Sequence, residues 1–243
     1  MPENGEEKKM KKFLVLIVFA MIIIFALSCG NEKKSSGYEL ALITDVGTID
    51  DRSFNQGSWE GLKKYAEEKG ITHKYYQPTE KTTDAYIDSI DLAVSAGAKI
   101  VVTPGFLFEP AIYKAQDIHP EVNFVLLDGS PQDGNYQDFR IEKNVYSVFY
   151  AEEEAGFLAG YGAVKEGYTN LGFMGGMAVP AVVKFGYGFV QGVNYAAKEF
   201  GIKNVKVDYN YLGGFNPSPE TQTKAASWYR NGVQVIFVAG GGA

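Results

Sequence analysis

The stretch YELALITDVGTIDDRSFNQGSWEGLKKYAEEKG, residues 38–70, contains the structural unit that the rest of the chain is expected to repeat. Its apolar start, residues 38–45, predicts a short buried strand. A polar loop follows. A helix is then expected from about residue 55 to residue 69, because apolar side chains such as Leu62 and Ala66 recur on one helical face. The stretch therefore predicts a strand, a loop and a helix that packs on the strand.

The same unit recurs along the chain. Further strands are predicted at residues 72–76, 99–103, 123–127, 145–149, 170–175, 206–211 and 235–238. Helices are predicted at 82–96, 109–118, 151–166, 182–200 and 219–231. Strands that alternate with helices of this length favour parallel sheets covered on both faces, so the fold class is α/β. Tyr187 and Phe189, on the helix expected at 182–200, are interpreted as core residues.

The alternation restarts after Gly167, which predicts two Rossmann-like β/α lobes with a ligand cleft between them. We place an N-terminal lobe at residues 38–150 and a second lobe at 151–243. The predicted strand at 235–238 leads into a glycine-rich end without a further helix. The second lobe is therefore expected to be incomplete, with the C-terminal part truncated.

The first residues have the pattern of an export signal. Four lysines precede an apolar run from residue 13 to residue 27, which is shorter than the roughly 20 residues of a membrane-spanning helix. The run ends at Ser28 and Cys29, as in bacterial lipoprotein signals. We interpret residues 1–28 as a lipoprotein signal peptide, Cys29 as the lipidated residue and 29–37 as a polar tether. A plain secretion signal is the weaker interpretation.

Composition argues against several classes of protein. The formal net charge is −6, with 23 Lys and Arg against 29 Asp and Glu, and no basic stretch follows the signal, so a nucleic-acid partner is not expected. The single cysteine excludes an internal disulfide and a cysteine-based zinc site. The chain shows neither a P-loop nor the G-x-S-x-G of a hydrolase, and we expect no cofactor, no metal and no catalytic residues.

Ligands of open α/β sheets bind at the carboxyl ends of the strands, so the residues after each predicted strand are the candidate site. Asp45 and Asp128 each end a predicted strand. Asp51, Ser53 and Asn55 lie in the loop before the first helix. Asp51 or Ser53 is also expected to cap that helix, because Asp and Ser are preferred capping residues. Carboxylates accept O–H and N–H groups and repel phosphate, which predicts an uncharged ligand.

Aromatic residues in loops supply candidates for stacking against a flat ligand. Phe54 and Phe215 lie in loop segments where strand or helix burial does not require them. Packing beneath the loops is the competing interpretation for these two residues. Phe185 is an alternative to Phe215 as a stacking residue.

Gly240 and Gly241 are expected to form a close-approach turn at the cleft. Residues 152–154, three consecutive glutamates, are interpreted as the solvated start of a helix.

These motifs resemble a known family. Residues 42–56 (LITDVGTIDDRSFNQ), 127–129 (LDG), 153–160 (EEAGFLAG), 185–189 (FGYGF) and 239–241 (AGG) are similar to the basic membrane protein family of bacterial lipoproteins. Its members are PnrA-type purine nucleoside receptors, the substrate-binding components of ABC importers. The resemblance runs from residue 38 to residue 243.

The resemblance implies a type I periplasmic-binding-protein fold that holds a purine nucleoside between two lobes. It implies a stacking role for Phe54, polar contacts to base or ribose at Asp45 and Asp128, and a second stacking ring at Phe215 or Phe185. The family's later acidic and lysine contacts to ribose lie beyond residue 243. The partners it implies are an ABC permease and its ATPase subunits. The protein is expected to be a monomer, held at the cell membrane by its N-terminal lipid and facing the periplasm or the exterior.

Three alternatives remain open at this point. The same fold could bind a sugar or another small polar ligand with the same residues at the strand ends. A nucleoside-processing enzyme would use an aspartate cluster, which Asp45, Asp50 and Asp51 imitate only in part. A surface adhesin is compatible with a lipoprotein, but no motif favours it. The expected function is therefore binding and delivery of a purine nucleoside, not catalysis.

Overall fold

The computed structural model describes residues 39–45 and 47–241. The predicted signal peptide, the lipidation site at Cys29 and the tether at residues 29–37 lie outside the described residues.

A five-stranded parallel sheet forms the first half of the described chain, with the strand order β2-β1-β3-β4-β5. Its strands are β1 (Leu40–Ile43), β2 (His73–Tyr76), β3 (Ile100–Pro104), β4 (Asn123–Leu127) and β5 (Val145–Val148). Its helices are α2 (Phe54–Lys69), α3 (Thr83–Ser95), the short 3-10 helix η1 (Phe106–Phe108) and α4 (Glu109–Ile118). Side chains alternate along each strand, so Leu40 and Leu42 pack toward α2, whereas Ala41 and Ile43 pack toward α3 and α4.

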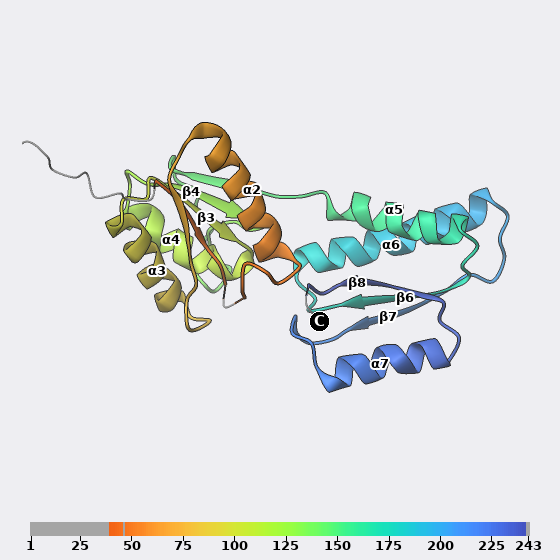
Figure 1. Cartoon of the computed structure of the whole chain (residues 1–243). Helices are drawn as coiled ribbons and strands as arrows, with labels where there is room; N and C mark the ends of the chain where they lie inside the picture. The colour runs from red at the N-terminus through yellow and green to blue at the C-terminus, as the bar shows by residue number, and fades with distance from the viewer. Residues whose placement is uncertain (1–38, 46, 242–243) are drawn as a thin grey trace, which may run out of the picture. The chain divides into compact units, whose positions relative to one another are not determined.

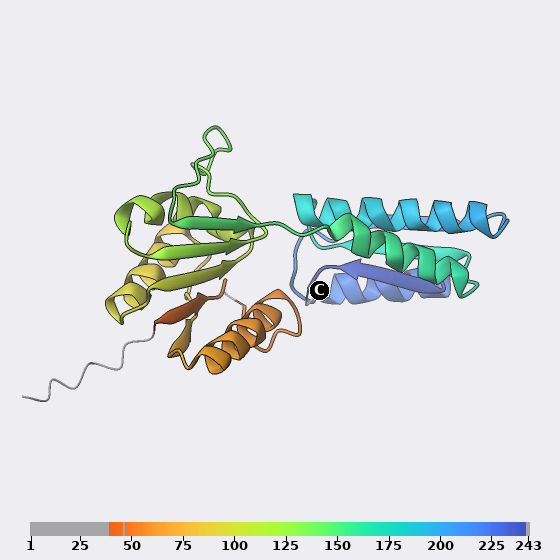
Figure 2. The same ribbon diagram turned by 90° about the horizontal axis from the view of Figure 1, so that it is seen from above.

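A three-stranded parallel sheet follows, with the strand order β7-β6-β8. Its strands are β6 (Asn170–Gly175), β7 (Lys206–Tyr211) and β8 (Val235–Ala239). Its helices are α5 (Glu152–Lys165), α6 (Pro180–Glu199) and α7 (Pro219–Arg230). Helices α5 and α6 lie side by side on one face of this sheet, and α7 covers the other face (Figures 1 and 2).

The structure confirms the predicted α/β class, with parallel strands and helices on both faces of each sheet. The domain boundary between residues 150 and 151 stays a prediction. Phe189 is 1% exposed, as expected of a core residue. The same prediction for Tyr187 was wrong, because this side chain is 63% exposed. Its neighbours Gly186 and Gly188 are buried instead, so this part of α6 packs through backbone and the tyrosine points outward.

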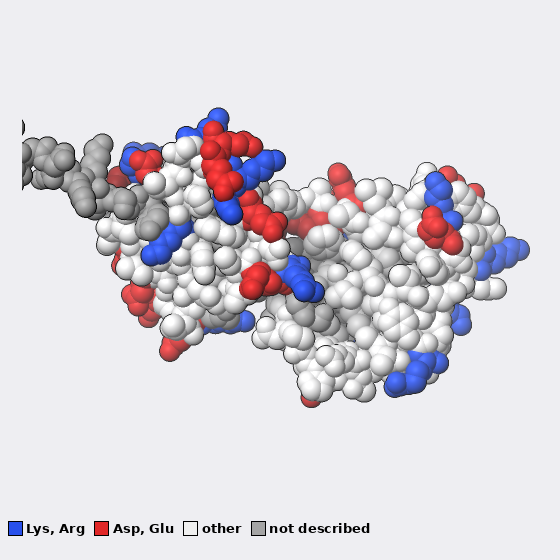
Figure 3. All heavy atoms as spheres, in the orientation of Figure 1, with Lys and Arg blue, Asp and Glu red and all other residues white. Residues whose placement is uncertain are grey.

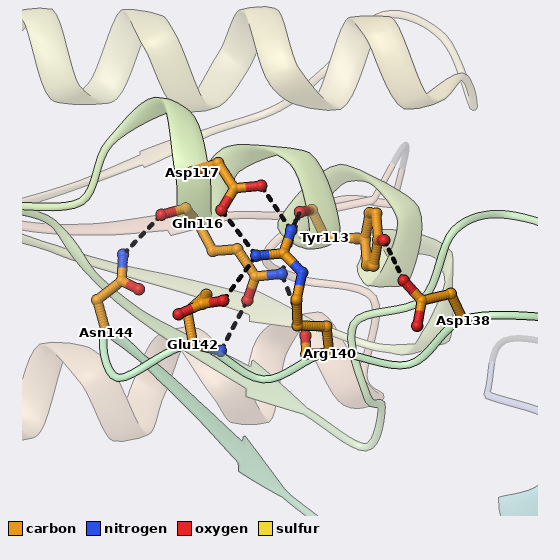
Figure 4. Close-up of polar contacts among 7 residues, drawn as sticks. All are labelled: Tyr113, Gln116, Asp117, Asp138, Arg140, Glu142 and Asn144. Atoms are coloured by element: carbon orange, nitrogen blue, oxygen red, sulfur yellow. Dashed lines mark hydrogen bonds and ion pairs between the residues drawn. The ribbon is translucent and has the colours of Figure 1, made fainter.

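Two polar side chains hold the β4–β5 connection against α4 (Figure 4). The Gln116 amide is buried, donates to the carbonyls of Tyr113 and Arg140, and accepts from the Glu142 N–H at 3.0 Å. Arg140 donates to Asp117 at 2.5 Å and to Glu142 at 2.7 Å. These contacts hold the β4–β5 connection, which contains no helix, at the end that leads into β5.

We expect Gln116→Leu to lower the free energy of unfolding by about 1–3 kcal/mol, since the Arg140 carbonyl and the Glu142 N–H would lose a buried partner. Urea unfolding followed by circular dichroism measures this loss. The exposed Gln137 in the same connection serves as the control, and Gln137→Leu should change stability by no more than about 0.5 kcal/mol. Equal losses in the two variants would contradict the bracing role of Gln116.

Candidate ligand-binding site

A buried asparagine organises the loop between β1 and α2. The Asn55 side chain is 6% exposed. Its amide donates to Asp45 at 2.9 Å and to Asp51 at 3.0 Å. The structure therefore brings together three of the predicted site residues, although Asn55 acts as the link between the two carboxylates. A Cβ atom at Gly47 would lie 2.5 Å from this amide, so a larger residue there would displace the Asn55 side chain.

Asp51 caps helix α2. Its carboxylate accepts from the backbone N–H groups of Ser53 at 2.8 Å, Gln56 at 3.1 Å and Asn55 at 3.3 Å. Ser53 occupies the capping position itself, but its side chain makes no capping hydrogen bond. The expectation that one of the two residues caps the helix is confirmed for Asp51. The Ser53 hydroxyl therefore does not take part in capping α2.

Phe54 presents an aromatic ring at the start of α2. The ring is 38% exposed and meets Tyr150 edge-on, with the ring centroids 6.4 Å apart. Ser53, Phe54 and Tyr150 also line an open groove of about 540 Å³ that runs over the sheet beside α2. The groove walls are mainly apolar and include Leu127 at the end of β4. Asp45 and Asp128 do not line the groove, so it reaches the candidate site only at its Phe54 end.

Asp128 directly follows β4 in a left-handed backbone conformation, with φ of 57°. Burial is the main cause that raises its pKa to about 6, and the neighbouring Glu152 carboxylate adds to the shift. The loop behind it is held by Glu109, a buried residue at the start of α4 that accepts from the Ser130 N–H at 3.0 Å. Burial raises the pKa of Glu109 as well. This strand end therefore places a partly buried carboxyl group where parallel-sheet folds bind ligands.

The interpretation of residues 152–154 as a solvated helix start was wrong for one of them. Glu152 is 4% exposed, whereas Glu153 and Glu154 are exposed. The Glu152 carboxylate accepts from the Lys184 ammonium at 3.1 Å. Sequence reasoning missed both Glu152 and Lys184 as residues beside Asp128.

The candidates in the second half of the chain differ in their surroundings. Phe185 is half-buried and meets Phe237 of strand β8 edge-on, with the ring centroids 6.1 Å apart. Phe215 is also half-buried, and its ring lies so close to Gly176 that a Cβ atom there would come within 2.5 Å. Among the described residues, no ring contact joins either phenylalanine to Phe54.

Gly240 and Gly241, the residues expected to form a close-approach turn, directly follow β8. Gly240 is buried, and Gly241 has a φ of 57°, a conformation that favours glycine. A Cβ atom at Gly241 would lie 2.9 Å from the Ser53 hydroxyl oxygen. The structure thus places Gly241 next to Ser53, two predicted site residues from opposite ends of the described chain.

The described part of the chain, residues 39–45 and 47–241, contains no group of three or more His, Cys, Asp and Glu side chains able to hold a metal ion. None of its helices is long and apolar enough to cross a membrane. On the face drawn in Figure 3, Lys and Arg are scattered among Asp and Glu and form no continuous basic area.

We expect Asp51→Ala to lower the free energy of unfolding by about 1–2 kcal/mol, because α2 would lose the acceptor for its first N–H groups. Thermal or urea unfolding measures the effect. Asp50 is the matched control, since it is the exposed neighbour in the same loop. Asp50→Ala should leave stability nearly unchanged, and a comparable loss in both variants would argue against the capping role.

Comparison with known proteins gives a consistent result. The sequence model of a family described as "ABC transporter substrate-binding protein PnrA-like" matches residues 38–243. The ABC transporter nucleoside-binding protein BmpA of Lactococcus lactis is 32% identical over 215 residues, which is 86% of this chain and 57% of that protein. Basic membrane protein A1 of Borrelia garinii is 30% identical over 235 residues, which is 96% of this chain and 65% of that protein.

The solved structures include an ABC transporter solute-binding protein from Aeropyrum pernix. It is 25% identical, superposes with a TM-score of 0.69, and the match covers 83% of this chain and 55% of that protein. The chain therefore has the α/β fold of periplasmic solute-binding proteins, and it spans about 57–65% of the length of the two relatives described above.

Proposed function

This chain belongs to the family of PnrA-like ABC transporter substrate-binding proteins, and from that membership we propose that it binds purine nucleosides and delivers them to an ABC permease with its ATPase subunits. The protein is attached to the outer face of the cell membrane by a lipid on Cys29 and acts by binding and release, without catalysis. The name of the Lactococcus lactis relative, a nucleoside-binding protein, supports the choice of ligand class.

The exposed ring of Phe54 is the observation that carries the proposal. It lies between Ser53, which has no capping bond, and Asn55, which fixes the carboxylates of Asp45 and Asp51. A purine ring stacked on Phe54 gains about 1–3 kcal/mol. Carboxylates at the strand ends accept ribose O–H or base N–H groups and repel phosphate. The arrangement therefore favours a nucleoside over a nucleotide.

Asp128 completes the proposed site from the end of β4. Gly241 contributes to the site from its position next to Ser53. Phe215 or Phe185 supplies the second aromatic wall, as the family resemblance implies. Both rings are half-buried and pack against the core around Phe173 and Phe189, so each can be held in place there while one face remains for a ligand.

The test is isothermal titration calorimetry with the full-length protein, freed of bound ligand by partial unfolding and refolding. Guanosine, inosine and adenosine are expected to bind. Cytidine, with its smaller ring, should bind more weakly, and ribose, which offers no ring to stack, weaker still. GMP should not bind, because its phosphate would face the carboxylates. Binding of a sugar with no response to any nucleoside would overturn the proposal.

A further inference from the structure

Three charged side chains meet where β4 ends and where helices α5 and α6 begin. Glu152 is the first residue of α5 and is 4% exposed. The Lys184 ammonium from α6 donates to Glu152 Oε2 at 3.1 Å and to the Tyr150 carbonyl at 3.5 Å. The third member is Asp128, whose carboxyl group lies close enough to Glu152 for that carboxylate to raise its pKa. Lys184 thus anchors only one of the two Glu152 oxygens.

The second oxygen of Glu152 lacks a donor. Glu152 Oε1 is buried and has no hydrogen-bond partner among the described residues. If both carboxyl groups were ionised, two sets of acceptor atoms would face each other, and the buried pair would repel. A proton on Asp128 removes the repulsion and gives Glu152 Oε1 its missing donor. Burial together with Glu152 raises the pKa of Asp128 to about 6, which agrees with a proton held there in mildly acidic solution.

Other charged and titratable groups lie around the Asp128–Glu152 pair. Glu109 on α4 adds negative charge, and Lys184 on α6 offsets part of it. Tyr150, between β5 and α5, has its own pKa raised by burial and by the two carboxylates. Glu153 on α5 faces Lys184. The Asp128 backbone is fixed by a hydrogen bond from its N–H to the Val148 carbonyl at 2.7 Å.

We propose that Glu152 is a positioning residue for Asp128: its buried carboxylate, anchored by Lys184, holds the Asp128 carboxyl through a shared proton, and a ligand N–H or O–H group displaces that proton when it binds. The proposal rests on the proposed nucleoside function, since it names a second residue behind one ligand contact. It predicts that binding releases a proton and that affinity falls in acid.

The test measures inosine affinity by titration calorimetry from pH 7.5 to pH 5. If the ligand requires ionised Asp128, a pKa near 6 leaves about one tenth of the protein competent at pH 5, so the affinity should fall about tenfold. Titration at pH 6 in two buffers of different ionisation enthalpy should show release of about half a proton per nucleoside.

Two variants should shift this profile in opposite directions. In Glu152→Gln the amide can donate to Asp128, so Asp128 stays ionised and affinity should become nearly constant between pH 5 and pH 7.5. In Lys184→Gln the pair loses its cation, takes up its proton at higher pH, and should lose affinity already above pH 6. The exposed Glu154→Gln is the matched control and should keep the wild-type profile.

A wild-type profile in Glu152→Gln, or a shift of both variants in the same direction, would overturn the inference. Circular dichroism melting establishes that each variant is folded. The failure of the inference is distinguishable from the failure of the proposed function, because carbon NMR of the ligand-free protein also reports the titration of Asp128. A titration near pH 6 that moves down in Glu152→Gln would support the shared proton even if no nucleoside binds.

Discussion

Phe54→Ala should weaken purine nucleoside binding by about 5-fold to 150-fold, which corresponds to the loss of one stacking contact worth about 1–3 kcal/mol. The ring is 38% exposed and makes a T-shaped contact with Tyr150, so its removal deletes contact area for a ligand rather than core packing. Stability should therefore change little. Titration calorimetry with guanosine and inosine measures the affinity, and urea unfolding measures the stability.

Two further variants separate stacking from general loss of aromatic surface. Phe54→Trp keeps a flat ring and should retain most of the affinity. Phe139, which is 54% exposed in the β4–β5 connection, offers an aromatic residue outside the candidate site, and Phe139→Ala should bind as the wild type does. Unchanged affinity in Phe54→Ala, or an equal loss in Phe139→Ala, would remove Phe54 from the site.

The order of strands and helices could be predicted because each boundary carries local signals. Strand β4 is an apolar run followed by Asp128 and Gly129, and its observed bounds, Asn123–Leu127, match the prediction. Strand β7, Lys206–Tyr211, also matches. Helix α2 ends at Gly70, which adopts the left-handed conformation expected of a helix end. Signals of this kind lie within a few residues of the boundary they determine.

The missed residues depended on contacts that no local pattern contains. Arg140 and Gln116 meet across 24 positions of sequence. Glu152 was hidden by its two exposed neighbours, yet it shares a helical face with Gly156, Gly160 and Val164, which are all buried. The sequence shows this spacing of four residues. It did not predict a buried helix face, because glycine does not indicate burial as leucine does.

The same glycine face explains the error at Tyr187. Helices α5 and α6 approach each other so closely that a Cβ atom at Gly156 would overlap the Phe185 carbonyl oxygen, and one at Gly188 would overlap the Glu153 carbonyl oxygen. Packing through backbone leaves large side chains on the outside of the pair. An aromatic residue next to two glycines is therefore not evidence of a core position here.

Gly188→Ala should lower the free energy of unfolding by about 1–3 kcal/mol, because the added Cβ atom can be accommodated only if α5 and α6 move apart. The clash involves the backbone of Glu153, which cannot rotate away as a side chain could. The shift would also displace the start of α5, where Glu152 faces Asp128. We therefore expect weaker nucleoside binding in the same variant, measured by titration calorimetry beside urea unfolding.

Gly162→Ala provides a control of opposite sign. Gly162 lies in α5, and a Cβ atom there would have no neighbour within 4 Å. Alanine is the better helix former by roughly 0.5–1 kcal/mol, so this variant should be more stable than the wild type and bind normally. If both variants gained stability, helix propensity alone would account for the result. Opposite signs in stability would show that glycine is needed at Gly188, where the two helices touch. Weaker nucleoside binding in Gly188→Ala but not in Gly162→Ala would show that this contact supports the strand end at which the ligand is proposed to bind.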